Sequence, residues 1–283
     1  GDEVILPTPF WVSYSAMIRL AEGVIREITT TVEADFKISP EQLEAAITPK
    51  TKLIMFSSPC NPTGSVYNHA ELAALADIIA RHPHVYVISD EIYEHINFSD
   101  KHVSLASFEH VADRVITVNG LSKAFAMTGW RLGFIGAPAW IAKACDKMQG
   151  QYTSATCSIT QRAAIAALNG GLETVDEMKA AFLRRKQLVF GLLKEIEGIK
   201  LNDPQGAFYF FPDMRNYFGR SFAGEVIRNA DDLALFLLYH GNISVVSGSA
   251  FGDANCIRLS YATSDEKLKE AMRRLKSALA LLQ

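Results

Sequence analysis

The sequence predicts an α/β protein in which a mostly parallel sheet is covered by helices on both faces, followed by a smaller α+β region. Over the first two-thirds of the chain, short β-rich apolar runs alternate with helical patterns. This alternation is typical of parallel sheets buried between helices. After about Thr153 the pattern changes to long helices and a few short strands, which is typical of helices packed on a small sheet.

The composition is that of a globular protein with a large core. The chain has 283 residues, of which 49% are hydrophobic and 21% charged, and this length suggests two domains. The net charge of −3 and the lack of a basic stripe argue against a nucleic-acid partner. No uncharged run reaches the length of a membrane span. We therefore expect a soluble, cytoplasmic protein with no nucleic-acid or membrane partner.

Six segments of the first part are predicted as strands, and two helix starts between them carry a reciprocal cap. Ser39 is followed by Pro40 and Gln42, and Asn68 by Glu71; both patterns are typical of the first turn of a helix. Leu72, Leu75, Ala76 and Ile79 follow the second cap at helical spacing. The predicted strands cover 4–6, 24–28, 52–57, 85–89, 114–118 and 132–137.

The second part is predicted to hold three helices and three short strands. The helices cover 174–196, 231–240 and the stretch from about 265; the strands cover 207–211, 243–246 and 256–260. We place the domain boundary inside the long helix, near residue 180. This gives a large domain over 1–180 and a small domain over 181–283. Because the chain runs from Gly1 directly into an apolar strand, we expect it to start inside the large domain.

The four cysteines are scattered, with no C-x-x-C pair. This spacing argues against a zinc ribbon or a disulfide scaffold. Reduced, buried thiols in a reducing compartment are expected instead. The cysteines are Cys60, Cys145, Cys157 and Cys256.

A stiff loop with the sequence SPCNPTG covers residues 58–64, directly after a predicted strand. Ligands of parallel sheets bind beyond the carboxyl ends of the strands. Two prolines and a glycine restrict this loop, so Asn61 is a candidate binding group. Taken alone, the segment is better explained as an ordinary turn at the strand's exit.

An acidic segment, SDEIY, follows the next strand over residues 89–93. Asp90 is a candidate to face a pocket, with Ile92 and Tyr93 beside it. A metal site is the alternative, with ligands drawn from Asp90, Glu91, Glu94 and His95. The known zinc motifs need a second histidine at a fixed offset, which this segment lacks, so the sequence predicts no metal.

Three cationic side chains lie in two motifs further along the chain. Lys123 and Arg131 share the glycine-bounded segment NGLSKAFAMTGWRLG. A lysine that is desolvated beside other cations suits Schiff-base chemistry, and arginine suits a phosphate; a lysine with its stem along the surface is the alternative. Arg258 lies in the apolar strand IRLSY. It needs an anionic partner there, either a structural ion pair or a carboxylate ligand.

These four motifs, in this order, resemble those of the class I/II aminotransferases, which are fold-type-I pyridoxal-phosphate enzymes. Each motif alone is weak, whereas four in order are specific, and the resemblance covers essentially the whole chain. The segment PFWVSY at 9–14 and the run KAFAMTGWR at 123–131 are similar to the bacterial aspartate aminotransferase branch in particular. The resemblance implies the three-layer fold-type-I large domain and pyridoxal 5'-phosphate as cofactor.

The resemblance also implies the roles of the catalytic groups. Lys123 would form the internal aldimine and then move the proton at the substrate's Cα. Asp90 would pair with the pyridine nitrogen, so that the ring stays protonated and accepts electrons. Tyr93 and Asn61 would hydrogen-bond the phenolic oxygen of the ring.

The remaining contacts follow from the same resemblance. Trp11 would stack on one face of the ring and Ile92 would press on the other. Ser122 and Arg131 would hold the phosphate. Arg258, together with Asn61, would bind the α-carboxylate of the substrate and thereby orient the Cα–H bond.

The implied function is transamination of an L-amino acid by a homodimer, with aspartate and 2-oxoglutarate as the expected amino acid and 2-oxo acid. An aromatic or prephenate aminotransferase, a pyridoxal-phosphate-dependent lyase and a cyclopropane-forming synthase are alternatives with the same cofactor. A fragment that keeps the fold without activity is the alternative of a different class. The resemblance places the reader of the substrate's side chain upstream of Gly1.

Overall fold

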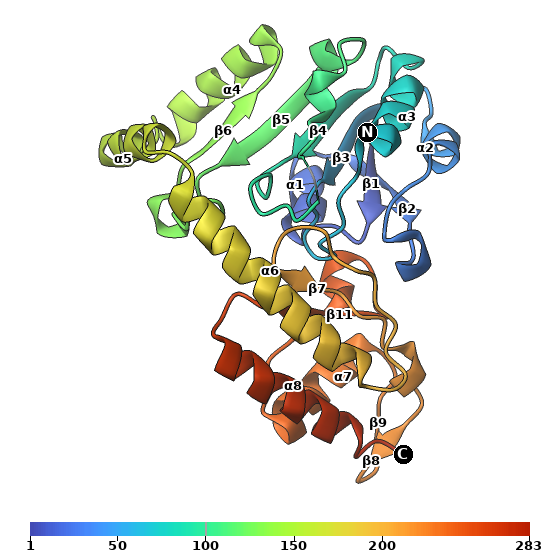
Figure 1. Cartoon of the computed structure of the whole chain (residues 1–283). Coiled ribbons are helices and arrows are strands. Elements are labelled where there is room, and N and C mark those ends of the chain that lie inside the picture. The colour runs from blue at the N-terminus through green and yellow to red at the C-terminus, as the bar shows by residue number, and fades with distance from the viewer. Residues whose placement is uncertain (100) are drawn as a thin grey trace.

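A six-stranded sheet forms the centre of the first part of the chain in the computed structural model, which describes residues 1–99 and 101–283 (Figure 1). The strand order is β2-β1-β3-β4-β5-β6. Strands β1 to β5 run parallel and β6 is antiparallel to β5, which confirms the mostly parallel sheet. The strands are β1 (Glu3–Thr8), β2 (Val24–Thr29), β3 (Thr51–Ser57), β4 (Tyr86–Asp90), β5 (Val115–Gly120) and β6 (Gly133–Gly136).

Helices pack on both faces of the central strands, because neighbouring residues of a strand point to opposite sides. Ile5 of β1 lies in a core cluster with side chains of α2 and α3. The next residue, Leu6, lies in a different cluster with Tyr14 and Ile18 of α1. The helices are α1 (Ser13–Leu20), α2 (Pro40–Ala46) and α3 (His69–Ala80).

Both predicted capping boxes are confirmed. At α2, Gln42 N donates to Ser39 Oγ (3.2 Å) and Ser39 N donates to Gln42 Oε1 (2.9 Å). At α3, Glu71 N donates to Asn68 Oδ1 (3.0 Å) and Asn68 N donates to Glu71 Oε2 (2.7 Å). Each pair satisfies two backbone donors that a helix start otherwise leaves free.

Helical cover stops before β6. All residues of β6 are exposed, and none of the 14 residues of α4 (Ala139–Tyr152) is buried. α5 (Ser158–Asn169) continues from this edge towards the second part (Figure 1). Large apolar side chains are exposed on these elements: Phe134, Ile135, Trp140, Met148, Tyr152, Ile159, Ile165 and Leu168.

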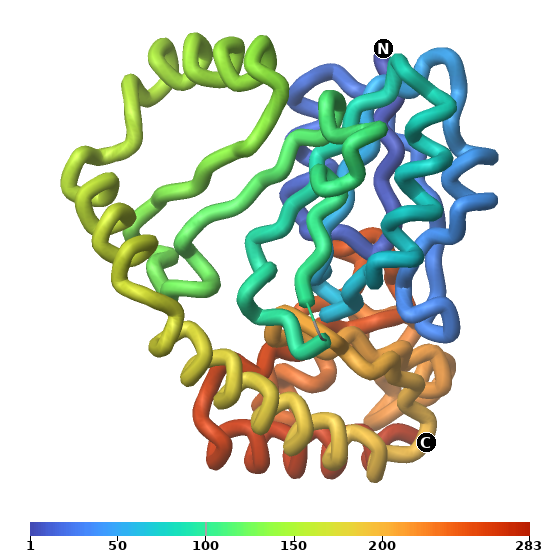
Figure 2. Tube along the Cα trace, turned by 45° about the horizontal axis from the view of Figure 1, so that its top comes forward, coloured from blue at the N-terminus to red at the C-terminus, as the bar shows by residue number. Residues whose placement is uncertain are grey.

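The second part packs three helices around a small antiparallel sheet with the order β10-β11-β7. The predicted helices and strands are all present, and their apolar faces form one core cluster. α6 runs from the sheet domain into this part, so both parts share one helix (Figures 1 and 2). The boundary near residue 180 stays a prediction. The elements are α6 (Glu173–Lys194), β7 (Tyr209–Phe210), β8 (Ser221–Phe222), β9 (Glu225–Val226), α7 (Ala230–Gly241), β10 (Val246–Ser247), β11 (Ile257–Ser260) and α8 (Asp265–Leu279). Short 3-10 helices cover Val32–Ala34, Leu105–Ser107, Ala112–Arg114, Thr128–Trp130, Arg215–Tyr217 and Gly248–Phe251.

The two parts interlock beside the loop that follows β3. Gln205 N and Gly206 N both donate to the carbonyl oxygen of Gly64 (2.9 Å each). Asn202 Nδ2 donates to the carbonyl oxygen of Thr63 (3.2 Å). These bonds fix residues 202–206 of the second part against residues 63–64 of the first.

Two of the four cysteines are exposed, although buried thiols were expected. All four are free; Cys256 is buried and Cys60 is half-buried, whereas Cys145 and Cys157 are exposed. Cys145 lies on α4 and Cys157 directly precedes α5. Both are exposed because this edge of the sheet carries no covering layer.

Within residues 1–99 and 101–283, none of the helices combines the length and the apolar character needed to cross a lipid bilayer.

Candidate active site

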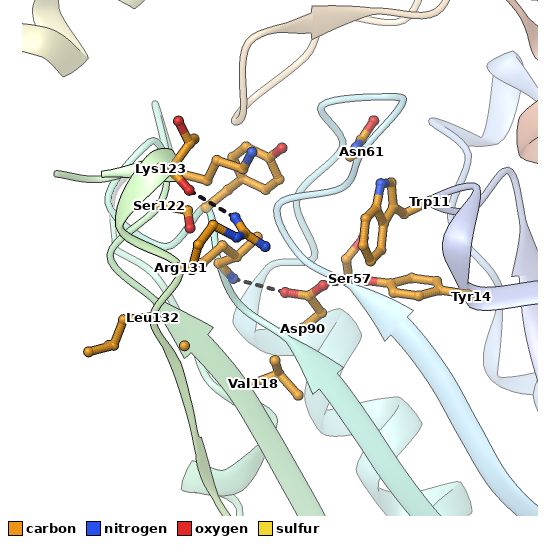
Figure 3. Close-up of a pocket in the computed structure, with 14 residues that line it drawn as sticks. Trp11, Tyr14, Ser57, Asn61, Asp90, Val118, Ser122, Lys123, Arg131 and Leu132 are labelled. Carbon is orange, nitrogen blue, oxygen red and sulfur yellow. Dashed lines mark hydrogen bonds between the residues drawn. The ribbon is translucent and has the colours of Figure 1, made fainter. Parts of the chain in front are cut away.

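A cavity of about 510 Å³ opens where the carboxyl ends of β3, β4 and β5 meet the start of β6 (Figure 3). Sheet register places Ser57 of β3 beside Asp90 of β4, and Asp90 beside Val118 of β5. All eight residues predicted to bind the cofactor line this one cavity. The lining residues are Trp11, Tyr14, Ser57, Asn61, Asp90, Ile92, Tyr93, Val118, Ser122, Lys123, Thr128, Arg131, Leu132 and Gly133.

Asp90, the last residue of β4, provides the carboxylate of the cavity. Its Oδ2 accepts a hydrogen bond from the Tyr14 hydroxyl (2.5 Å), and its Oδ1 accepts one from Ile92 N (3.1 Å). Burial raises the pKa of Asp90, while the hydrogen bond from Tyr14 acts in the opposite direction. The carboxylate is therefore held in one orientation by a donor on each oxygen.

Lys123 lies in a compact turn after β5. The turn is closed by backbone bonds from Phe125 N and Met127 N to the carbonyl oxygen of Leu121 (3.3 Å each). The Lys123 amine lies 5.8 Å from the centre of the Tyr93 ring. Burial lowers the pKa of Lys123, the guanidinium groups of Arg258 and Arg131 lower it further, and Asp90 opposes them. More of the amine is neutral near pH 7 than for a free lysine.

Ser122 and Arg131 lie at the two ends of the same segment and both line the cavity. Arg131 Nη1 donates to the carbonyl oxygen of Thr128 (2.8 Å), and its guanidinium is exposed. The backbone is tight beside them: a Cβ on Gly120 would lie 2.9 Å from the carbonyl oxygen of Leu132. Glycine at this position lets β5 and the following segment approach closely.

Arg258 of β11, in the second part of the chain, is not one of the residues that line the cavity, but it is hydrogen-bonded to Asn61, which does line it. Its Nη1 donates to Asn61 Oδ1 (2.9 Å), and its guanidinium lies between the rings of Tyr209 and Phe251 (4.6 and 4.8 Å from their centres). Its Nε is buried and has no hydrogen-bond partner among residues 1–99 and 101–283. Within the described residues, one buried donor of this guanidinium is therefore unused.

Four aromatic side chains form two pairs at the site, Tyr93 with Tyr209 and Trp11 with Tyr14. Tyr93 is buried and its hydroxyl lies 2.9 Å from that of Tyr209; burial raises the pKa of Tyr93, so its hydroxyl stays protonated. Trp11 packs edge-on against Tyr14, with 5.4 Å between ring centres. Tyr93, Trp11 and Tyr14 line the cavity together with Asp90 and Lys123. The walls beside the two charged side chains are therefore partly apolar.

Of the four side chains of the metal alternative, Glu94 and His95 are paired with each other (3.4 Å between Oε1 and Nε2), and the three carboxylates are bound by different donors. Glu91 accepts from His102, Glu94 accepts from Asn119, and Asp90 accepts from Tyr14. In the described part of the chain, no cluster of three or more His, Cys, Asp or Glu side chains is arranged for a metal ion.

Two side chains of the site were missed by the sequence analysis. Tyr14 contacts Asp90, and Tyr209 contacts both Tyr93 and Arg258. A signal existed for Tyr14, because it stands three residues after Trp11 and therefore on the same side of a helical turn. Tyr209 belongs to a strand that was predicted, but nothing in its local pattern says which site it faces.

The comparisons with known proteins agree with this geometry. Residues 1–275 match the family described as aminotransferase class I and II. The bifunctional aspartate aminotransferase and glutamate/aspartate-prephenate aminotransferase of Petunia hybrida is 46% identical over 288 residues, covering 100% of this chain and 60% of the relative. The aspartate/prephenate aminotransferase of Cereibacter sphaeroides is 45% identical over 283 residues, covering 99% of this chain and 71% of the relative.

Solved structures share the fold over the full chain. The aspartate aminotransferase from Rhizobium meliloti superposes with a TM-score of 0.96 at 41% identity, covering 100% of this chain and 72% of that protein. The predicted fold-type-I architecture is therefore confirmed. The chain spans 60% of the length of the Petunia relative and 71% of that of the Cereibacter relative.

Proposed function

Since the chain belongs to the class I and II aminotransferase family, we propose that it catalyses pyridoxal-phosphate-dependent transamination of an L-amino acid, with aspartate and 2-oxoglutarate as its substrates. The observation that carries the proposal is the convergence of Asp90, Lys123 and Arg131 on one cavity. An anion, a half-buried amine and a fixed cation are the groups that this cofactor requires of a protein.

The residues present fit the cofactor. A carboxylate held by two donors, Asp90, suits the protonated ring nitrogen. The exposed guanidinium of Arg131 and the hydroxyl of Ser122 suit a phosphate. Trp11 and Ile92 line the cavity with apolar surface, and we assign them the two faces of the ring.

When bound, pyridoxal phosphate supplies an aldehyde that condenses with amines and a ring that accepts the electron pair released at the substrate's Cα. Lys123 provides the amine, and its lowered pKa keeps part of it neutral and able to take up a proton. Asn61 and Tyr93 present an amide and a hydroxyl beside this amine. We assign both to the phenolic oxygen of the ring.

Arg258 is the proposed clamp for the substrate's α-carboxylate. Its guanidinium is fixed between two aromatic rings and by a hydrogen bond to Asn61, so a carboxylate beside Asn61 would meet an arginine that is already ordered. Orienting the substrate in this way holds the Cα–H bond towards Lys123.

Aspartate is proposed because the relatives at 45–46% identity are named for aspartate. Prephenate also appears in both names, so an aminotransferase for prephenate is the second candidate. A homodimer and a cytoplasmic location stay predictions. The exposed apolar side chains of β6, α4 and α5 support a contact with another polypeptide.

The test is to locate the modified lysine. The chain is mixed with pyridoxal phosphate, reduced with borohydride and digested, and the pyridoxyl adduct is mapped by mass spectrometry. We expect the adduct on Lys123, its loss in Lys123→Ala, and its retention in the matched surface variant Lys143→Ala. An adduct spread over surface lysines, unchanged in Lys123→Ala, contradicts the proposal.

Product analysis then separates the candidates. Aspartate with 2-oxoglutarate yields oxaloacetate and glutamate if the proposal holds, and prephenate in place of the oxo acid yields its amino product if the second candidate holds. Release of ammonia identifies a lyase. A chain that carries the adduct on Lys123 and forms none of these products is a non-catalytic cofactor binder.

A further inference from the structure

Helix α1 and the turn that precedes it bring two side chains, Tyr14 and Trp11, to the cavity. Tyr14 N donates to the carbonyl oxygen of Trp11 (2.9 Å), which forms the first turn. The two rings then pack edge-on, with an interplanar angle of 87°. Ile18, one turn further along, anchors the helix in the core against Leu6 and Met55. The helix is thus fixed to the sheet, and with it the position of the Tyr14 ring.

The Tyr14 hydroxyl has one partner among the described side chains, the Asp90 carboxylate. Only 4% of Tyr14 is exposed, so water does not compete for the hydroxyl. Burial and the neighbouring Asp90 both raise the pKa of Tyr14, so the hydroxyl remains a donor. Ile92 N occupies the other carboxylate oxygen, and rotation of the carboxylate about its Cβ–Cγ bond breaks both bonds.

We propose that Tyr14 is a positioning residue for Asp90, holding the carboxylate ionised and aimed at the ring nitrogen of pyridoxal phosphate. The inference rests on the proposed function for the identity of that ring. The inference goes beyond the proposed function because it assigns a role to Tyr14, which lies outside the four sequence motifs. Because Trp11 packs on Tyr14, the start of α1 fixes both the orientation of the Asp90 carboxylate and the wall of the cavity that Trp11 forms.

A charge-assisted hydrogen bond in a buried site affects the acceptor's titration directly. Without the Tyr14 hydroxyl, the ionised form of Asp90 loses a donor while its burial is unchanged. The pKa of Asp90, already raised by burial, then rises further. A carboxyl that is ionised less of the time and is less firmly oriented would hold the protonated ring less well, so the affinity for the cofactor is expected to fall.

The first arm of the test uses the chain without cofactor. The Asp90 carboxyl is titrated by carbon NMR in the parent chain and in Tyr14→Phe, which keeps the ring and its packing and lacks only the hydroxyl. The matched control is Tyr217→Phe. Tyr217 is also 4% exposed, and its hydroxyl donates over the same 2.5 Å, but to the carbonyl oxygen of Glu197 in the second part of the chain.

The second arm measures binding of pyridoxal phosphate by absorbance. Loss of a hydrogen bond to a charged group is expected to weaken binding about ten- to a hundredfold in Tyr14→Phe. Tyr217→Phe is expected to bind as the parent chain does.

The two arms separate the inference from the proposed function. The inference is supported if the titration midpoint of Asp90 moves to higher pH in Tyr14→Phe and not in Tyr217→Phe, whether or not the chain binds the cofactor. An unmoved midpoint overturns it, as does a shift of equal size in Tyr217→Phe. If the parent chain takes up no pyridoxal phosphate while the midpoint moves, the proposed function fails and the Tyr14–Asp90 link stands.

Discussion

The amine of Lys123 lies among charges of both signs, and this setting decides its reactivity. Burial and the guanidinium groups of Arg258 and Arg131 lower its pKa, and Asp90 raises it by a smaller contribution. A neutral amine attacks a carbonyl, whereas an ammonium does not. The two arginines of the site therefore help to lower the pKa of Lys123 below the ordinary lysine value of 10.5, so that the amine is neutral nearer to neutral pH.

Removing the charge of Arg258 is expected to move the reactivity of Lys123 to higher pH. The rate of covalent attachment of pyridoxal phosphate at Lys123 is measured against pH by borohydride trapping. The parent chain gives a midpoint below 10.5. In Arg258→Gln the midpoint moves up, because one of the groups that lower the pKa is lost.

Arg258→Lys is the matched variant, because it keeps the positive charge and changes the shape. Its midpoint is expected to stay near that of the parent chain. Equal midpoints in all three proteins would show that the charge of Arg258 does not reach Lys123.

The end of β4 carries Asp90 and the turn after it carries Ile92 and Tyr93; both are held in place by Glu91, which lies between Asp90 and Ile92. The buried Glu91 carboxylate accepts hydrogen bonds from Ser89 Oγ (3.0 Å), Ser104 Oγ (2.8 Å) and His102 Nε2 (2.8 Å). These donors come from β4 and from the loop over 102–104. One carboxylate thus ties the end of β4 to a neighbouring loop, on the side opposite to the cavity residues.

Truncating Glu91 is expected to destabilise the chain strongly. Glu91→Ala leaves three donors without their acceptor in a buried place, so we expect the free energy of unfolding to fall by about 3 kcal/mol. Urea unfolding followed by circular dichroism measures this. Glu44→Ala is the control: Glu44 also accepts from a histidine, His82, but at the surface, and its loss is expected to cost under about 0.5 kcal/mol. Similar losses in both variants contradict the structural role of Glu91.

The two parts of the molecule meet at the cavity through contacts between residues far apart in the chain. Arg258 and Asn61 are 197 residues apart and joined by a hydrogen bond. Beside them, Gly64 has φ of +68°, and a Cβ there would lie 2.5 Å from Pro204 Cβ and 2.8 Å from the carbonyl oxygen of Gly206. The Asn61 loop therefore sits against the second part with no space between them.

Gly64→Ala is expected to separate the two parts and to weaken the site. The new methyl group pushes residues 204–206 away, which costs about 1–3 kcal/mol of stability beyond the strain of the positive φ. Binding of a dicarboxylate substrate analogue should weaken with it, because Asn61 and Arg258 move apart.

Gly219→Ala controls for the backbone strain. Gly219 has φ of +85° and open space around its Cα, so alanine there carries the strain without the clash. Calorimetry gives the stability of both variants and titration calorimetry the binding of the analogue. Equal losses in the two variants would show that the contact between the parts contributes nothing.

Most of the helices that were predicted differ from the missed ones in how they start. α2, α3, α7 and α8 each begin with a side chain that caps the first turn, and all four were predicted. α1, α4, α5 and α6 begin without a side-chain cap. Of these, α6 was predicted from its long helical pattern of apolar residues, whereas α1, α4 and α5 were not predicted.

The candidate residues of the site were found from their types and their places after predicted strands, and the roles expected of them came from the resemblance to the class I/II aminotransferases. Strand and cap positions followed from near neighbours in the chain. The links that complete the site join Tyr14 to Asp90 across 76 residues, Tyr93 to Tyr209 across 116, and Asn61 to Arg258 across 197. These contacts depend on the order of strands in the sheet and on how the second part docks beside it. Only the packing of residues far apart in the sequence fixes these contacts, which is why the tertiary structure, and not the sequence alone, revealed them.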